Sequence, residues 1–181
     1  TPLVMAGGQI QLRLAVAGGS GHTVALRGDG SVWAAGYNGD GQLGQPGGDS
    51  AVFRPVPGLA GVVQIAAGGS HVLALRADGT VAAWGGNWSG QCGAGTFETS
   101  FVPVTVPGLA GVVAIAAGSE HSLALLADGS VVAWGAAWGG QLGDGSTEAR
   151  PTPAVVPGLS GIARIASGSS AAAPVPAAGA R

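Results

Sequence analysis

The chain repeats itself with a period of about fifty residues, and this repeat constrains its fold more than any other feature. Three anchors, a histidine, an Asp-Gly pair and a GQxG box, keep their order and spacing in three copies. They stand at His22, His71 and His121, at Asp29-Gly30, Asp78-Gly79 and Asp128-Gly129, and at boxes that begin with Gly41, Gly90 and Gly140. Each series advances by 49 and then by 50 residues. A repeat of this length indicates a solenoid, a propeller or another array of similar units.

Each copy is predicted to form four β-strands. In the second copy these are Val62–Ala67, His71–Ala77, Thr80–Gly85 and Phe101–Val106. The Asp-Gly pair between apolar runs is a strong hairpin signal, because glycine adopts a positive φ without steric cost. No segment carries apolar residues at i, i+3, i+4 and i+7 over three turns, as an amphipathic helix would.

The composition of the strands favours sheets that are stacked around a ring. A lone four-stranded sheet this rich in alanine and valine cannot bury both of its faces, whereas radial stacking buries them. Pro103 marks the fourth strand as an edge, since proline cannot donate to a sheet ladder. The predicted fold is therefore all-β, a partial β-propeller of about three four-stranded antiparallel blades plus the start of a fourth. A superhelical β-solenoid is the alternative, but its coils are usually much shorter than this repeat.

The repeats divide nearly the whole chain into units. A fourth copy begins at Gly161 with GIARIASGSS, and Ala171 stands where a fourth histidine would fall. We expect propeller repeats over residues 1–170, with blade units at about 8–60, 61–110 and 111–160 and a stub at 161–170. The tail at 171–181 carries no strand pattern and is expected to be disordered.

The segment IAAGSEHSLALLADGSVVAWGAAWGGQLGDGSTEARPTP and its counterpart in the second copy resemble the regulator of chromosome condensation repeat. A histidine after glycine, an alternating leucine strand, a D-G turn, a W-G pair, a GQLG loop and a later proline-valine strand carry the resemblance. It implies a seven-bladed propeller with four antiparallel strands per blade. The family includes a nucleotide exchange factor for a small GTPase, secreted bacterial β-lactamase inhibitors, and many propellers of unknown partner.

The chain departs from the family pattern in residue type and in the number of copies. The departures in residue type are Ala35-Gly36 for W-G with Trp33 displaced, Cys92 for the leucine of GQLG, and Ala137 for the asparagine kept at Asn38 and Asn87. Three copies and a stub cannot close a seven-bladed ring. We expect the missing blades to come from the rest of a longer chain or from oligomerisation, the other possibility being open sheet edges; a fragment is the favoured interpretation.

Charge and hydropathy argue against nucleic-acid and membrane partners. Lysine is absent, the seven arginines are scattered, and the formal net charge is −2, whereas nucleic-acid binding needs a concentrated basic surface. No apolar run reaches the roughly 20 residues of a membrane span. Abundant Ala, Gly, Pro, Val and Arg without Lys is typical of a GC-rich bacterial genome. The compartment stays open because the chain begins at Thr1, with a secreted or cell-surface location as one expectation.

We expect no metal, no cofactor and no catalytic residue. Histidines on successive blades are spread around a ring, so they do not converge on one ion as metal ligands must. Each Asp-Gly pair supplies one acidic group, whereas a calcium loop needs several. The GQLG boxes lack the Lys-Ser/Thr ending of a phosphate-binding loop. Glu120-His121 places an acid beside a base, but strand neighbours point to opposite faces. Cys92 is the only cysteine and is expected to be a buried apolar residue.

The loop between the W-G pair and the GQxG box is the candidate binding region. Equivalent loops on adjacent blades should line one face of the ring, and aromatic side chains are enriched at protein interfaces. The candidate partner-binding residues are Tyr37, Asn38, Asp40, Asn87, Trp88, Ser89 and Trp138, whereas Trp84 and Trp134 are expected in the core. The alternative is that each loop tryptophan folds back and caps its own blade.

Three functions follow from these patterns. The leading one is a non-catalytic propeller module that binds a protein partner through loops on one face. The second, by resemblance alone, is a guanine-nucleotide exchange factor-like regulator of a small GTPase. The third is a carbohydrate-binding or hydrolytic propeller.

Overall fold

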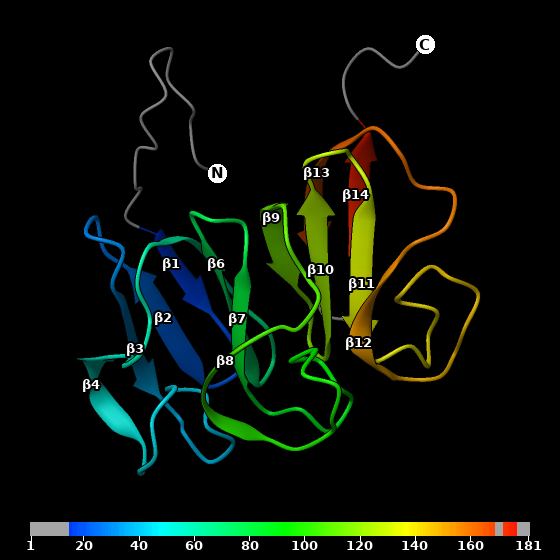
Figure 1. Ribbon diagram of the computed structural model, residues 1–181. Coiled ribbons are helices and arrows are strands. Elements are labelled where there is room, and N and C mark those ends of the chain that lie inside the picture. Colours follow the sequence, from blue (N-terminus) through cyan, green and yellow to red (C-terminus); the bar gives the residue numbers. More distant parts are fainter. Residues whose placement is uncertain (1–14, 169–171, 177–181) are drawn as a thin grey trace, which may run out of the picture.

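The computed structural model describes residues 15–168 and 172–176, and their regular structure is β-strand throughout (Figure 1). The strands of the first two sheets are β1 (Ala15–Gly18), β2 (His22–Leu26), β3 (Val32–Gly36), β4 (Ser50–Pro55), β5 (Val62–Ala67), β6 (His71–Arg76), β7 (Val81–Gly85) and β8 (Ser100–Thr105). Those that follow are β9 (Val112–Ala117), β10 (His121–Leu126), β11 (Val131–Gly135), β12 (Arg150–Val155), β13 (Ile162–Ser167) and β14 (Ala172–Pro176). The described residues contain no helix that could cross a membrane.

The strands form three four-stranded antiparallel sheets, ordered β1-β2-β3-β4, β5-β6-β7-β8 and β9-β10-β11-β12, and a two-stranded sheet, β13-β14. Figure 1 shows these sheets following one another around part of a ring. The predicted all-β partial propeller is confirmed. The predicted strands of the second copy differ from the observed ones by at most one residue at either end.

The strand β14 differs from the sequence-based expectation. We expected no regular structure after residue 170, yet Ala172–Pro176 pairs antiparallel with β13. An edge strand such as β13 presents a row of unpaired backbone groups, which another segment satisfies through its main chain whatever its side-chain pattern. Residues 169–170 of the predicted stub, residues 171 and 177–181 of the predicted tail, and residues 1–14, which include the start of the blade unit predicted at about 8–60, lie outside the described residues.

Burial along the second strand of each blade shows why the sheets stack. In β2, buried residues alternate with half-buried ones, because a described neighbour covers only one face of the first sheet. In β6, every residue from His71 to Leu75 is buried, since blades lie on both sides. The inner strands β1, β5, β9 and β13 contact one another in turn, whereas β4, β8 and β12 are outer edges with exposed side chains.

The buried tryptophans tie each blade to the one before it. Trp84 Nε1 donates to the Gln42 main-chain oxygen at 2.9 Å, and Trp134 Nε1 donates to the Gln91 oxygen at 2.8 Å. Both indoles are fully buried in the apolar clusters between blades, as the sequence predicted. The GQxG box of one repeat is therefore the acceptor for the W-G pair of the next.

The repeated histidines are buried, and their surroundings differ between blades. His71 Nε2 lies 2.9 Å from Ser122 Oγ, which itself donates to the Gln91 main-chain oxygen at 2.8 Å. His22 has Val72 at the position equivalent to Ser122, and neither of its ring nitrogens has a hydrogen-bond partner among the described residues. Burial lowers the pKa of His22 to about 4 and that of His71 to about 3, and it also lowers the pKa of His121.

Stability is expected to fall as the pH falls from 6.5 towards 4. The buried histidines stay neutral in the folded state, while in the unfolded state they bind protons near their ordinary pKa of about 6.5. Their contribution is thus fully present above pH 6.5 and is lost below it, at up to about 1.4 kcal/mol per pH unit for each histidine. Thermal unfolding followed by circular dichroism between pH 8 and 4.5 measures this. A melting temperature that is constant from pH 7 to 5 would contradict it.

The substitution Val72→Thr is expected to stabilise the protein. The introduced hydroxyl would stand where Ser122 Oγ stands one blade later and could accept a hydrogen bond from His22, a gain of about 1 kcal/mol at nearly constant volume. The reverse change, Ser122→Val, leaves His71 without this partner and costs about 1–3 kcal/mol. Urea denaturation of the two variants compares the effects, and equal shifts of the same sign would rule out the hydrogen bond as the cause.

Candidate partner-binding face

The loops singled out from the sequence lie at the same end of every blade as the turn that follows the innermost strand. His22 pairs with Gly36, His71 with Gly85 and His121 with Gly135, so the preceding turns and the following loops adjoin. Main-chain hydrogen bonds of 2.8 Å join them in each blade. We call this end the loop face; it comprises residues 18–21, 68–70 and 118–120 and the loops 37–49, 86–99 and 136–149.

Two asparagines hold the first two loops from inside. Asn87 Nδ2 donates to the main-chain oxygens of Thr96 and Glu98, both at 2.9 Å, while its Oδ1 accepts from Cys92 N at 2.8 Å. Asn38 makes the same three bonds in its own loop, to Gln45 O, Gly47 O and Leu43 N. Both side chains are buried, and each amide group donates two hydrogen bonds and accepts one within its own loop.

This burial corrects part of the predicted binding site. Asn38 and Asn87 shape the loops and cannot present their side chains to a partner. Ser89 is also buried; its Oγ donates to Glu120 Oε2 at 2.9 Å and its N–H to Gln91 Oε1 at 2.9 Å. The residue type of a polar loop residue does not reveal whether its side chain is hydrogen-bonded inside the protein. The sequence therefore could not distinguish these buried residues from exposed ones.

The three aromatic residues of the site are exposed. Tyr37 and Trp88 each leave 48% of their surface accessible and Trp138 leaves 60%. The Trp88 ring lies over Gly86, where an added Cβ would approach the ring atoms to 2.7 Å, and the Tyr37 ring lies over Gly39 in the same manner. The absence of a side chain at Gly86 and Gly39 allows the Trp88 and Tyr37 rings to contact their own loops while about half of each residue's surface stays exposed. The alternative that the loop tryptophans cap the blade cores does not hold, because Trp88 and Trp138 are about half exposed. The tryptophans buried in the blade cores are Trp84 and Trp134.

The structure adds two residues that the sequence analysis did not assign to this site. Glu120 accepts from Ser89 Oγ and, at 3.3 Å, from Trp88 Nε1, which joins the second loop to the turn of the third blade. The residues at the equivalent position of the other two copies are Gly21 and Ser70. The carboxylate that only the third copy carries at this position was the sequence signal that could have pointed to Glu120. Phe97 is half exposed in the second loop and has no counterpart at its position in the other copies.

Negative charge is concentrated at the loop face. Six of the nine carboxylates belong to it: Asp40, Asp49, Glu98, Glu120, Asp144 and Glu148. Among residues 15–168, Arg150 is the arginine located at this end, and it forms an ion pair with Asp144. The three other aspartates occupy the Asp-Gly turns at the opposite end, where hydrogen bonds from Ser31, Thr80 and Ser130 lower their pKa values.

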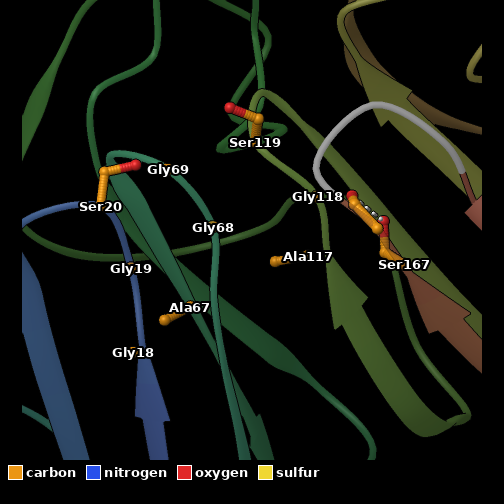
Figure 2. Close-up of a pocket in the computed structure, with 11 residues that line it drawn as sticks. Gly18, Gly19, Ser20, Ala67, Gly68, Gly69, Ala117, Gly118, Ser119 and Ser167 are labelled. Carbon is orange, nitrogen blue, oxygen red and sulfur yellow. Dashed lines mark hydrogen bonds between the residues drawn. The ribbon is translucent and has the colours of Figure 1, made fainter.

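The innermost turns enclose a shallow pocket of about 250 Å³ (Figure 2). Glycine, alanine and serine residues line it, and main-chain hydrogen bonds from Ser20 N to Gly69 O and from Gly69 N to Ser119 O join successive turns. The histidine rings lie directly against these turns: a Cβ on Gly68 would fall 2.2 Å from His71 Cε1. Among the described residues, those that line this pocket include no titratable side chain.

The described residues hold no group of three or more His, Cys, Asp or Glu arranged to bind a metal ion. Burial raises the pKa of the Cys92 thiol to about 12, and the histidines are kept neutral as described above. A thiol with so high a pKa is a poor nucleophile, because the thiolate is the reactive form. The chemistry of the loop face is thus that of a surface with exposed aromatic rings and carboxylates.

The stacked four-stranded sheets, the repeat and the tryptophan-to-box contacts define a β-propeller repeat protein. The family model described as the regulator of chromosome condensation repeat matches residues 29–75, 78–125 and 128–173, and a second model of that repeat matches 14–42 and 62–91. The chain belongs to this family. No curated protein matches it.

Solved structures of the family resemble the chain over most of its length. Yeast RCC1 (Prp20), crystallised with Kap60, has a TM-score of 0.80 and 28% identity, over 90% of this chain and 41% of Prp20. Human WBSCR16 has a TM-score of 0.79 and 28% identity, over 90% of this chain and 44% of its own. A second structure, of Prp20p from Saccharomyces cerevisiae, described with its binding to Gsp1p and histones, has a TM-score of 0.75, 28% identity and coverages of 90% and 42%. The chain thus spans less than half the length of these relatives.

Asn87→Ala is expected to destabilise the protein far more than Trp88→Ala, although the two residues are adjacent. The asparagine change leaves two carbonyls and one amide without partners inside the loop, a cost of about 3 kcal/mol. The tryptophan change removes a half-exposed ring and should cost under about 1 kcal/mol. Urea denaturation measures both. Equal costs would show that the Trp88 ring is part of the core.

Proposed function

We propose that the chain is a non-catalytic propeller module that binds a protein partner through its loop face. Tyr37, Trp88 and Trp138 are the central contacts, and Asp40 belongs to the same loop as Tyr37. The observation that carries the proposal is that the equivalent loops of three successive blades each carry an aromatic ring that is about half exposed, Trp88 and Trp138 at the same repeat position and Tyr37 two residues before it. Such rings bury a large area with few rotatable bonds, and residues of this type dominate the energetics of protein interfaces.

The support beneath the rings strengthens the proposal. Trp88 is held by contact with Gly86 and by its hydrogen bond to Glu120, and Tyr37 by contact with Gly39. Ordering a free side chain at an interface costs about 0.5–1.5 kcal/mol, and this cost is smaller when the side chain is already placed.

The charges of the loop face favour a partner with basic side chains. The carboxylates at this end outnumber its described arginine six to one, and that arginine is paired with Asp144. Complementary charge raises the association rate and selects against acidic partners. Binding should therefore weaken as the salt concentration rises.

A second candidate is regulation of a small GTPase by nucleotide exchange. It is supported by the similarity to Prp20, whose solved structure is described with its binding to Gsp1p and histones. The chain covers 42% of that protein. Faster release of a labelled guanine nucleotide from a small GTPase when the chain is added would support this candidate over simple binding.

Trp88→Ala combined with Trp138→Ala is expected to abolish capture of the partner, because each anchor ring contributes about 2 kcal/mol or more. The measurement is a pull-down with the full chain as bait, followed by titration calorimetry with the partner recovered. Phe53→Ala combined with Val155→Ala is the matched control, since these exposed apolar residues lie on the outer strands β4 and β12. The control should keep the partner. Unchanged capture by the tryptophan variant would refute the proposal.

A further inference from the structure

The carboxylate of Glu120 joins the second loop to the third blade. Glu120 ends the turn before β10, and its side chain is half-buried. Its Oε2 atom accepts hydrogen bonds from Ser89 Oγ at 2.9 Å and from Trp88 Nε1 at 3.3 Å. Because Ser89 is buried and belongs to the preceding blade, these bonds fix the carboxylate at the junction of two blades.

One oxygen of this carboxylate is left without a partner. A carboxylate offers about four acceptor sites on its two oxygens, and both donors bond to Oε2. Among the described residues, no group donates to Glu120 Oε1, and the ion pair that they contain is that of Arg150 with Asp144. Since the serine hydroxyl and the indole N–H are neutral donors, the negative charge of Glu120 is not neutralised.

The other carboxylates of the loop face are bonded differently. Asp40 and Asp49 accept hydrogen bonds from within their own loop, and Asp144 is neutralised by its arginine. Of the six, Glu120 is the one whose carboxylate accepts hydrogen bonds from another blade. A cationic group of a partner therefore meets a charge that is already placed, which reduces the ordering cost of the contact.

Trp88 provides an apolar surface next to this charge. It leaves 48% of its surface accessible, and its Nε1 atom lies 3.3 Å from Glu120 Oε2. Lysine and arginine combine an aliphatic stem, which packs on apolar surface, with a cationic end that stays with polar groups. The exposed ring and the carboxylate beside it match these two parts of a basic side chain.

We propose that Trp88 and Glu120 together bind a lysine or arginine side chain of the protein partner. The cationic group donates to Glu120 Oε1, and the aliphatic stem packs against the Trp88 ring. This inference rests on the proposed function and adds to it the residue of the partner that the second loop recognises. The equivalent positions of the other copies hold Gly21 and Ser70, so the contact is specific to the junction of the second and third blades.

The test uses peptides selected from a displayed random library by the immobilised full chain. Glu120→Gln is the variant, because its amide oxygen still accepts from Ser89 and Trp88 while the charge is lost. Asp78→Asn is the matched control, since it removes one charge at the opposite end of the blade and keeps an acceptor for Thr80. Each selected peptide is also made with glutamine in place of its basic residue, and titration calorimetry measures every combination of peptide and protein.

Lysine or arginine is expected to be enriched among the peptides that the wild-type chain selects. Such a peptide should bind Glu120→Gln about tenfold more weakly, the lower end of the couplings measured between close charge pairs, and Asp78→Asn with unchanged affinity. Replacing its basic residue by glutamine should cost as much with the wild-type chain and little with Glu120→Gln, because the two changes remove the same contact.

The outcomes separate this inference from the proposed function. A peptide that needs Trp88 and Trp138 but binds the wild-type chain and Glu120→Gln equally would overturn the inference and leave the proposed function standing. Enrichment of apolar or acidic peptides, or a loss of affinity that Asp78→Asn reproduces, would also overturn it. If no peptide is selected, or if the selected peptides keep their affinity for Trp88→Ala combined with Trp138→Ala, both the inference and the proposed function are wrong.

Discussion

A buried hydrogen bond between neighbouring blades organises this protein. The indole N–H of one blade donates to the main-chain oxygen of the glutamine in the box of the preceding blade, as Trp84 does to Gln42. An unpaired indole N–H or carbonyl in this apolar cluster would cost about 1–3 kcal/mol, so the two blades can approach only in the register that pairs them. The same contact closes the apolar core between two sheets whose alanine-rich strands have little surface of their own to bury.

The position of the box also decides the position of the loop face. The first two loops leave their blades after the third strand, are each fixed internally by an asparagine such as Asn87, and enter the box that meets the next blade. The second loop is thus fixed by buried contacts at Asn87 and at its box, while its exposed residues lie between them, at Trp88, and beyond the box, at 95–98. Among the exposed aromatic residues, Trp88 contacts Gly86 and Tyr37 contacts Gly39.

Much of the fold could be predicted from the sequence, because the repeat fixes which residues are equivalent. The strands, their order and the core positions of Trp84 and Trp134 follow from it. The candidate site was predicted less completely. Tyr37, Trp88 and Trp138 are exposed as a binding role requires, but Asn38, Asn87 and Ser89 are buried, and Glu120 was assigned no role in it. Hydrogen bonds that close a loop on itself depend on the path of its main chain, which residue type alone does not reveal.

The sequence by itself determined the repeat, the strands within it and the family, because these depend on local turn chemistry and on spacing along the chain. The tertiary structure decided which polar loop residues are buried and hydrogen-bonded inside the protein. It also decided that most of the carboxylates lie at one end of the blades. These properties arise where one blade meets the next, between residues such as Ser89 and Glu120 that lie far apart in the chain and come together only when the sheets stack.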